Sequence, residues 1–299
     1  MRLDDFDPND INVGQQRGGG GFGGGGGGGM LLGLLPLIGS RFGCGGIVVV
    51  LLLLAVFGGL GNLGGLVGGG GSGTSVQAPA SQPDAVRQAC STDAAHAACN
   101  AFQSAQTTWE QLFAKEGQRF AKPNLQFYSR SGTSGCGAAQ SAMGPFYCPS
   151  DQGIYLDTTF FDELQNRFGA AGDFAQYYVI AHEFGHHIQN LLGESTRVQR
   201  AQQAAGSEAA ANALSVGLEL QADCYAGVWA GQNRDRLDPG DVQEGMTAAA
   251  AIGDDTLQQK SGGRVSPESF THGTSAQRQA ALQRGLTTRD PAACQSLAS

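Results

Sequence analysis

Two histidines and a glutamate carry the clearest chemical signal in the sequence. His182, Glu183 and His186 form the pattern H-E-x-x-H, and their neighbours predict a helix over residues 173–192. Residues four apart share one face of a helix, so the two imidazoles could bind one zinc ion. The glutamate could then act as a general base toward water. Apolar flanks favour a buried helix over a chance motif on a solvated one, because unpaired histidines are costly to bury.

A third ligand is expected on a second helix, since catalytic zinc sites usually take three protein ligands. Residues 208–230 predict that helix, and on it Glu219 and Asp223 are four apart and share a face. Glu219 is the expected third ligand. Asp223 is expected to accept a hydrogen bond from the outer ring nitrogen of a ligand histidine. Two alternatives stay open: Asp223 could be the ligand, or both acids could lie on a solvated face.

These two motifs resemble a known family. H-E-x-x-H followed by E-x-x-A-D is similar to the gluzincin metallopeptidases. The strings AHEFGHHIQN at residues 181–190 and ELQADC at residues 219–224 look like the bacterial putative neutral zinc metallopeptidases. The resemblance covers nearly the whole chain and implies a membrane-anchored zinc metalloendopeptidase with one Zn²⁺ per chain. It implies that Glu183 takes a proton from a zinc-activated water and passes it to the leaving amine.

The resemblance also suggests groups that would meet the substrate. His272 is the candidate that stabilises the oxyanion of the tetrahedral intermediate, and Arg278 is the weaker candidate. The alternative for His272 is a loop histidine that caps a helix. One predicted strand is the candidate sheet edge that binds an extended peptide by backbone hydrogen bonds. An interior hairpin strand is the alternative for the same residues, which are Gly153, Ile154, Tyr155 and Leu156.

Composition divides the chain into four parts. Residues 1–29 indicate a Gly-rich cytoplasmic tail, and residues 30–67 a membrane anchor with its span at about 43–67. Residues 68–83 indicate a flexible linker, and residues 84–299 the zinc metallopeptidase domain outside the cytoplasm. Glycines in the span would allow helices to pack, so an oligomer is conceivable. The net charge of −8 gives no basic surface for nucleic acid, which leaves a protein or peptide substrate and the membrane as partners.

Basic residues set the expected orientation in the inner membrane. Arg2, Arg17 and Arg41 precede the span, and the next basic residue is Arg87. The positive-inside bias therefore places the N-terminus in the cytoplasm and the catalytic domain in the periplasm or outside the cell. A cleaved signal peptide is disfavoured, because the apolar stretch begins late and no clear cleavage site follows.

Cysteine usage agrees with an oxidising compartment. Six of the seven cysteines follow the predicted span, and an even number favours disulfide bonds. Local spacing suggests Cys90–Cys99 and Cys136–Cys148, which leaves Cys224–Cys294, although six cysteines permit other connectivities. No C-x-x-C pair supports the alternative that the cysteines bind zinc.

The remaining elements define the fold class. The pattern predicts a small set of strands, followed mostly by helices. The strands are expected at residues 124–130, 146–148 and 153–157, and further helices at 94–117, 158–168, 238–254 and 274–286, with a loop at 131–144. This is an α+β fold, mostly helical with a small sheet: a minimal gluzincin-like core after one N-terminal transmembrane helix.

Two rival functions remain at this stage. The domain could be a non-catalytic, zinc-containing scaffold or adaptor tethered to the membrane, or a zinc hydrolase of non-peptide amides. Glu183 speaks against the scaffold, because a structural zinc site needs no general base beside it.

Overall fold

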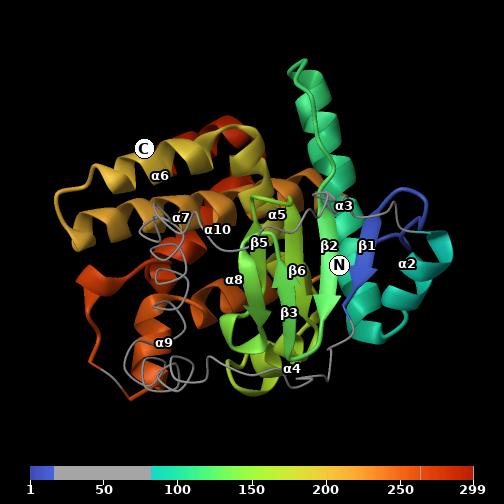
Figure 1. Ribbon diagram of the computed structural model, residues 1–299, viewed down its shortest axis with the longest axis horizontal. Helices are drawn as coiled ribbons and strands as arrows, with labels where there is room; N and C mark the ends of the chain where they lie inside the picture. Colours follow the sequence, from blue (N-terminus) through green and yellow to red (C-terminus); the bar gives the residue numbers. More distant parts are fainter. Residues whose placement is uncertain (17–81, 263, 299) are drawn as a thin grey trace, which may run out of the picture.

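The computed structural model describes residues 1–16, 82–262 and 264–298. These residues form an α+β fold in which helices dominate and the sheet is small, as predicted (Figure 1). The predicted anchor at residues 30–67 and the linker up to residue 81 lie outside the described residues. Among the helices of the described ranges, none is both long and apolar enough to cross a membrane.

Two long helices form the centre of the fold. Helix α5 (Asp173–Leu191) begins after Gly172 and ends before Gly193, both with positive φ. Helix α7 (Glu208–Gln232) begins at Ser207, whose side chain accepts the N–H of Ala210. Both helices were predicted. The N-cap residue of α5 is Gly172, although the next residue, Asp173, is of a type that caps helices better.

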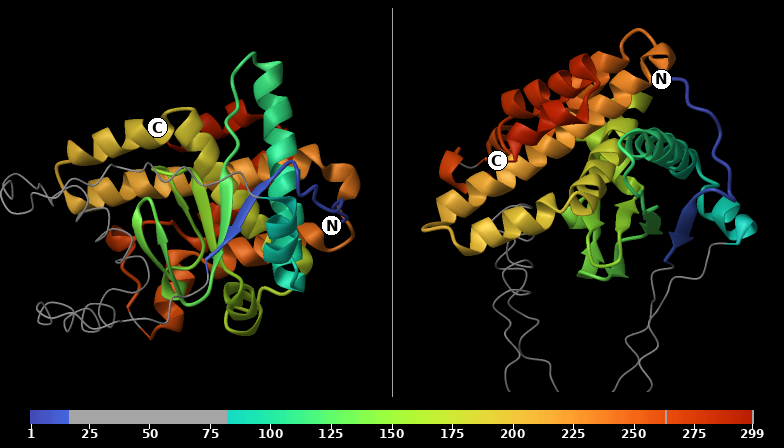
Figure 2. Two further views of the ribbon diagram at one scale, coloured as in Figure 1. Left: turned by 45° about the vertical axis from the view of Figure 1, so that its right-hand side comes forward. Right: turned by 90° about the horizontal axis from the view of Figure 1, so that it is seen from above.

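Helix α10 (Ser275–Thr288) lies beside α7, and glycines let the two backbones approach closely (Figure 2). A Cβ at Gly285 would lie 1.9 Å from the carbonyl oxygen of Cys224, and one at Gly227 would lie 2.1 Å from that of Leu282. Gly185 of α5 makes a similar approach to Ala222 of α7, at 2.9 Å. Larger residues at these positions would therefore push the three helices apart.

The other helices agree with the prediction in part. The helix expected at residues 238–254 is shorter, because α8 ends at Ala251. Three further helices, α2, α6 and α9, were not predicted. Besides α5, α7 and α10, the described residues form the helices α2 (Pro83–Ala89), α3 (Asp93–Lys115), α4 (Thr159–Asn166), α6 (Glu194–Gln203), α8 (Asp241–Ala251) and α9 (Asp254–Lys260).

The sheet has four strands in the order β1-β2-β6-β5, and the long helices α5, α7 and α10 lie on one side of it (Figure 2). The strands are β1 (Asn12–Gln15), β2 (Asn124–Tyr128), β5 (Phe146–Cys148) and β6 (Gly153–Asp157). Strands β1, β2 and β6 are parallel, and β5 pairs with β6 antiparallel. The predicted loop at residues 131–144 contains a hairpin of β3 (Ser131–Ser134) and β4 (Gly137–Gln140).

The prediction that residues 153–156 form a sheet edge is wrong. Strand β6 pairs with β2 on one side and with β5 on the other, so it lies inside the sheet. All five of its residues are buried, which is typical of a strand with neighbours on both sides. The strand at the edge beside β6 is β5.

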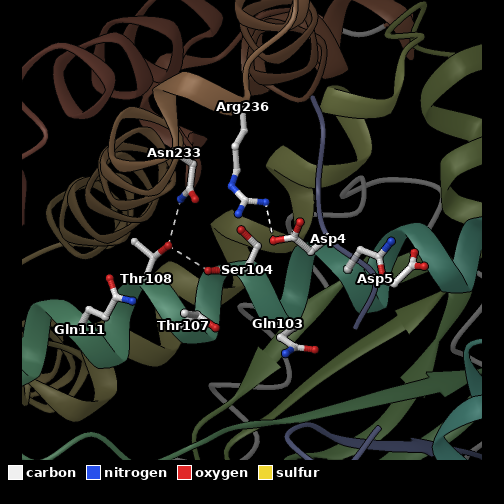
Figure 3. Close-up of a pocket in the computed structure, with 10 residues that line it drawn as sticks. Asp4, Asp5, Gln103, Ser104, Thr107, Thr108, Gln111, Asn233 and Arg236 are labelled. Carbon is white, nitrogen blue, oxygen red and sulfur yellow. Dashed lines mark hydrogen bonds and ion pairs between the residues drawn. The ribbon is translucent and has the colours of Figure 1, made fainter. Parts of the chain in front are cut away.

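Residues 1–16 belong to the folded unit, so the prediction of a separate N-terminal tail is wrong for them. Strand β1 pairs with β2, and Val13 is 1% exposed in the main core. The α-amino group of Met1 lies 2.9 Å from a carboxylate oxygen of Asp241. Figure 3 shows Asp4 beside Arg236, with which it forms an ion pair of 2.6 Å.

The three disulfide bonds that spacing suggested are present: Cys90–Cys99, Cys136–Cys148 and Cys224–Cys294. The first joins α2 to α3, and the second joins the hairpin to β5. The third joins the C-terminal segment to α7, next to Asp223.

Candidate metal centre

Helices α5 and α7 bring the three predicted ligands together. Nε2 of His182 lies 3.2 Å from Oε2 of Glu219, and Nε2 of His186 lies 3.6 Å from Oε1 of the same carboxylate. The potential ligand atoms of the three residues all lie within 4.8 Å of one another. One turn of α5 separates the histidines, and the close approach at Gly185 brings α7 to them.

The hydrogen bonds of the imidazoles suit a metal ion. Nδ1 of His182 donates to Asp223 (2.8 Å), and Nδ1 of His186 donates to Oε1 of Gln189 (2.8 Å). Because both outer nitrogens are held by protein acceptors, Nε2 is the ring nitrogen of each histidine that remains to bind a metal ion. Two imidazoles and one carboxylate form a donor set that Zn²⁺ accepts while a coordination position stays open. The residues therefore fit a catalytic zinc ion.

Electrostatics within the cluster keep the acid ionised. Burial alone would raise the pKa of Glu219, but His186 and His182 hold that pKa well below its ordinary value. Burial also lowers the pKa of His182, yet the neighbouring Asp223 and Glu219 raise it to about 10. The charged forms of Glu219 and His182 thus stabilise each other.

Glu183 lies on α5 between the two histidines and is 7% exposed. Burial raises the pKa of its carboxyl group, and the nearby His186 and His182 oppose that change. A raised pKa brings the carboxylate closer to the proton affinity that a general base needs at neutral pH.

Asp223 lies behind His182, away from the point where the three ligands meet. It is fully buried and accepts hydrogen bonds from Nδ1 of His182, the hydroxyl of Tyr178 (2.6 Å) and the guanidinium of Arg278. Burial would raise the pKa of Asp223, but Arg278 and His182 lower it to about 2. Of the two candidate acids on α7, Glu219 faces both Nε2 atoms and Asp223 contacts the outer nitrogen of His182.

His272 lies in the loop between α9 and α10, on the Glu219 side of the site. The electrostatic interaction of His272 and Glu219 is close enough that each shifts the pKa of the other. Nδ1 of His272 bonds to Oδ1 of Asp254 (3.1 Å), and Oδ2 of Asp254 accepts the backbone N–H groups of Thr271 and His272 at 2.7 Å each. Burial lowers the pKa of His272, but Asp254 and Glu219 outweigh it and raise that pKa.

Asp254 was missed by the sequence reasoning. It is 18 residues before His272, and no motif connects the two positions. Asp254 follows Gly253 at the start of α9. An acid in the first turn is common in helices of any function, so this position does not single it out.

The predicted oxyanion role of Arg278 is wrong. Its side chain is buried (2% exposed), and its guanidinium is directed at Asp223, Tyr178 and the carbonyl oxygen of Ile252. A guanidinium with these partners lies behind His182, on the side away from the point where the three ligands meet.

The family described as "Putative neutral zinc metallopeptidase" matches residues 5–297. The uncharacterised protein YpfJ of Escherichia coli K12 is 53% identical over 189 residues, which are 62% of this chain and 66% of that protein. An uncharacterised protein of Mycobacterium bovis is 45% identical over 194 residues, which are 60% of this chain and 64% of the relative. The chain thus spans slightly less than two thirds of the curated relatives. No solved structure matches it.

Proposed function

The chain belongs to the family described as putative neutral zinc metallopeptidases, and on that premise we propose that it is a zinc-dependent metallopeptidase that hydrolyses peptide bonds. The observation that carries the proposal is the convergence of His182, His186 and Glu219 beside the buried Glu183. A structural zinc site would have no use for a buried carboxylate at that place.

In this proposal His182, His186 and Glu219 hold one zinc ion. Zinc, when bound, supplies a Lewis acid and makes water a nucleophile at neutral pH. Glu183 accepts a proton from the attacking water and delivers it to the nitrogen of the leaving amine. Asp223 keeps the proton of His182 on Nδ1, so that Nε2 stays available to the metal.

His272 is the candidate oxyanion donor. Because Asp254 holds Nδ1 of His272, Nε2 is the ring nitrogen left for the substrate. The raised pKa of His272 favours the imidazolium, whose Nε2–H would donate to the charge that develops on the carbonyl oxygen.

Two surfaces beside the site support a peptide substrate. Strand β5 is the sheet edge nearest α5. The hydroxyl of its Tyr147 forms hydrogen bonds of 3.0 Å with His187 and with Asn190 of α5. We therefore assign the substrate-binding edge to β5. A hollow of about 500 Å³ lies between α7 and the segment before α10, with mostly apolar walls that include Val216 and Gly273. Gly273 follows His272, and Val216 is one turn before Glu219, so the hollow could take an apolar side chain of the substrate.

Three disulfide bonds support an oxidising compartment for the domain. We propose the periplasm or the exterior of the cell. The membrane anchor at residues 30–67 stays a prediction.

The decisive experiment measures zinc content and casein cleavage of the full chain and three variants. We expect one zinc per chain in the wild type, retained in Glu183→Gln while turnover falls about 10²–10⁴-fold. Glu219→Ala should lose both zinc and cleavage. Glu208→Ala removes an exposed acid from the same helix and should change neither.

Three outcomes would contradict the proposal. Full activity of Glu183→Gln would exclude Glu183 as the base. Zinc retained at wild-type affinity in Glu219→Ala would remove Glu219 as a ligand. Stoichiometric zinc in the wild type without cleavage of casein or of a mixed peptide library would favour the non-catalytic scaffold.

A further inference from the structure

Four side chains from three helices form a closed network behind the metal-facing side of His182. Oδ1 of Asp223 accepts from Nδ1 of His182, from the hydroxyl of Tyr178 and from Nη2 of Arg278, while Oδ2 accepts from Nε of Arg278. The two arginine bonds measure 2.9 and 2.8 Å, which is the paired fork geometry of a guanidinium on a carboxylate. Tyr178, Asp223 and Arg278 are each at most 2% exposed.

The packing of the helices delivers Arg278 to this place. It lies in the first turn of α10, where the capping box of Thr274 and Gln277 fixes the start of the helix. The contacts at Gly227 and Gly285 set α10 directly against α7. The side chain of Arg278 thus contacts Asp223, 55 residues earlier in the chain, and forms a buried ion pair with it.

The contacts of Asp223 give Arg278 a task that His182 and Tyr178 do not perform. His182 and Tyr178 each bond Oδ1 alone, while Arg278 bonds both carboxylate oxygens. Two parallel bonds from a planar guanidinium fix the orientation of a carboxylate, which bonds to one oxygen alone do not. The guanidinium also brings a permanent positive charge to a carboxylate that is fully buried.

We infer that Arg278 is a positioning residue that acts through Asp223: its paired hydrogen bonds hold this carboxylate in the orientation that accepts from Nδ1 of His182, and thereby fix the ring of His182 for metal binding. The inference rests on the proposed metal site. Arg278 also donates Nη1 to the carbonyl oxygen of Ile252 (3.2 Å), two residues before Asp254. One side chain therefore connects α7 to the turn between α8 and α9, next to the Asp254 that bonds His272.

The test is the zinc affinity of the full chain, measured by competition with a chromogenic chelator. Arg278→Met should weaken zinc binding about 10–100-fold, the range found when the partner of a ligand histidine is lost. Arg278→Lys should restore part of the affinity, because an ammonium supplies the charge without the fork. Arg284→Met removes an exposed arginine from the same helix and should leave the affinity unchanged.

A double-variant cycle separates this role from a merely structural one. If Arg278 acts through Asp223, adding Arg278→Met to Asp223→Asn should change the affinity by less than about twofold. That pair also removes both buried charges, so it should fold even where Arg278→Met alone does not. Wild-type affinity in Arg278→Met, or an equal loss in both backgrounds, would overturn the inference.

Failure of the inference can be told from failure of the proposed function. Zinc titration requires no cleavage, so a chain that binds zinc through His182 without hydrolysing peptides would overturn only the proposed function. Unchanged zinc affinity in Arg278→Met, with cleavage intact in the wild type, would overturn only the role of Arg278.

Discussion

At the scale of single residues, the carboxylate of Asp254 organises the loop that presents His272. One of its oxygens accepts three successive backbone N–H groups, those of Thr271, His272 and Gly273, and the other bonds the imidazole. Backbone bonds to one carboxylate fix the loop, and the bond to Nδ1 fixes the ring. The same acid therefore determines where Nε2 of His272 lies.

We expect His272→Ala to lower kcat about 100-fold, because one oxyanion donor contributes on the order of 3 kcal/mol. Zinc content should not change, since His272 is not among the three ligands. Steady-state kinetics on a peptide substrate, with zinc analysis of the same preparation, measure both quantities. His96→Ala, at a half-exposed histidine of α3, is the matched control. An unchanged kcat in His272→Ala would show that the oxyanion is stabilised elsewhere.

At the scale of elements, the sequence predicted most of what local spacing controls. The helices α5 and α7 and the ligands on them follow from the i, i+4 rule and from apolar flanks. Helix α6 was missed because Val198 is its one buried residue, so an apolar stripe is lacking. Strand β6 was recognised as a strand, but its interior place depends on pairing with β2, from which the β3–β4 hairpin and β5 separate it in the chain. Periodicity says nothing about pairing between separated strands.

The same limit explains the errors at the site. Arg278 follows His272 by six residues, which suggests that both face the substrate. The close packing of α10 on α7 turns Arg278 toward Asp223 instead. Partners that orient ligands come from distant positions in the chain, so no local motif reveals them.

Asp157 joins three elements at the end of β6, and its loss should destabilise the fold. It accepts the N–H of Arg130, the hydroxyl of Ser141, and both the N–H and the hydroxyl of Thr159 at the start of α4. We expect Asp157→Asn to lower the free energy of unfolding by about 1–3 kcal/mol at pH 7, because buried partners are left unsatisfied. Urea denaturation measures this change, and Asp162→Asn, an exposed acid of α4, is the control.

The same residue should make stability depend on pH. Burial would raise the pKa of Asp157, but its hydrogen bonds with Ser141, Arg130 and Thr159 outweigh burial and lower that pKa. A lowered folded-state pKa stabilises the fold above the unfolded value near 4, and this contribution is lost as the pH falls through the folded value. Asp157→Asn should therefore lose less stability than the wild type as the pH falls below about 4. Parallel acid profiles of the two would contradict this.

At the scale of the whole molecule, the first sixteen residues complete the sheet and close part of the core. Strand β1 pairs with β2 over four residues, with Val13 opposite Leu125, and both side chains are at most 1% exposed. Further along, Asp10 contacts Lys122, and Gln16 bonds the backbone of Thr133. Strand β1 was not predicted, because four residues are too few for a strand pattern to stand out beside the Gly-rich stretch that follows.

A charge in this strand should therefore weaken the entire fold. We expect Val13→Asp to lower the free energy of unfolding by about 3 kcal/mol or more, since it removes buried apolar area and buries a carboxylate without a partner. Gln15→Asp, at the exposed position of the same strand, should have little effect. Thermal and urea denaturation of the full chain would show it. Equal stability of the two variants would mean that β1 is not part of the folded unit.

The pairing of β1 with β2 also restricts which parts of the chain can lie on opposite sides of a membrane. Residues 1–16 belong to the same folded unit as residues 82–262 and 264–298, so both must lie on the same side of a membrane. The arginine pattern predicts a single passage through the bilayer, which would put the two paired strands on opposite faces. Whichever compartment holds the zinc ligands therefore also holds the first residues of the chain.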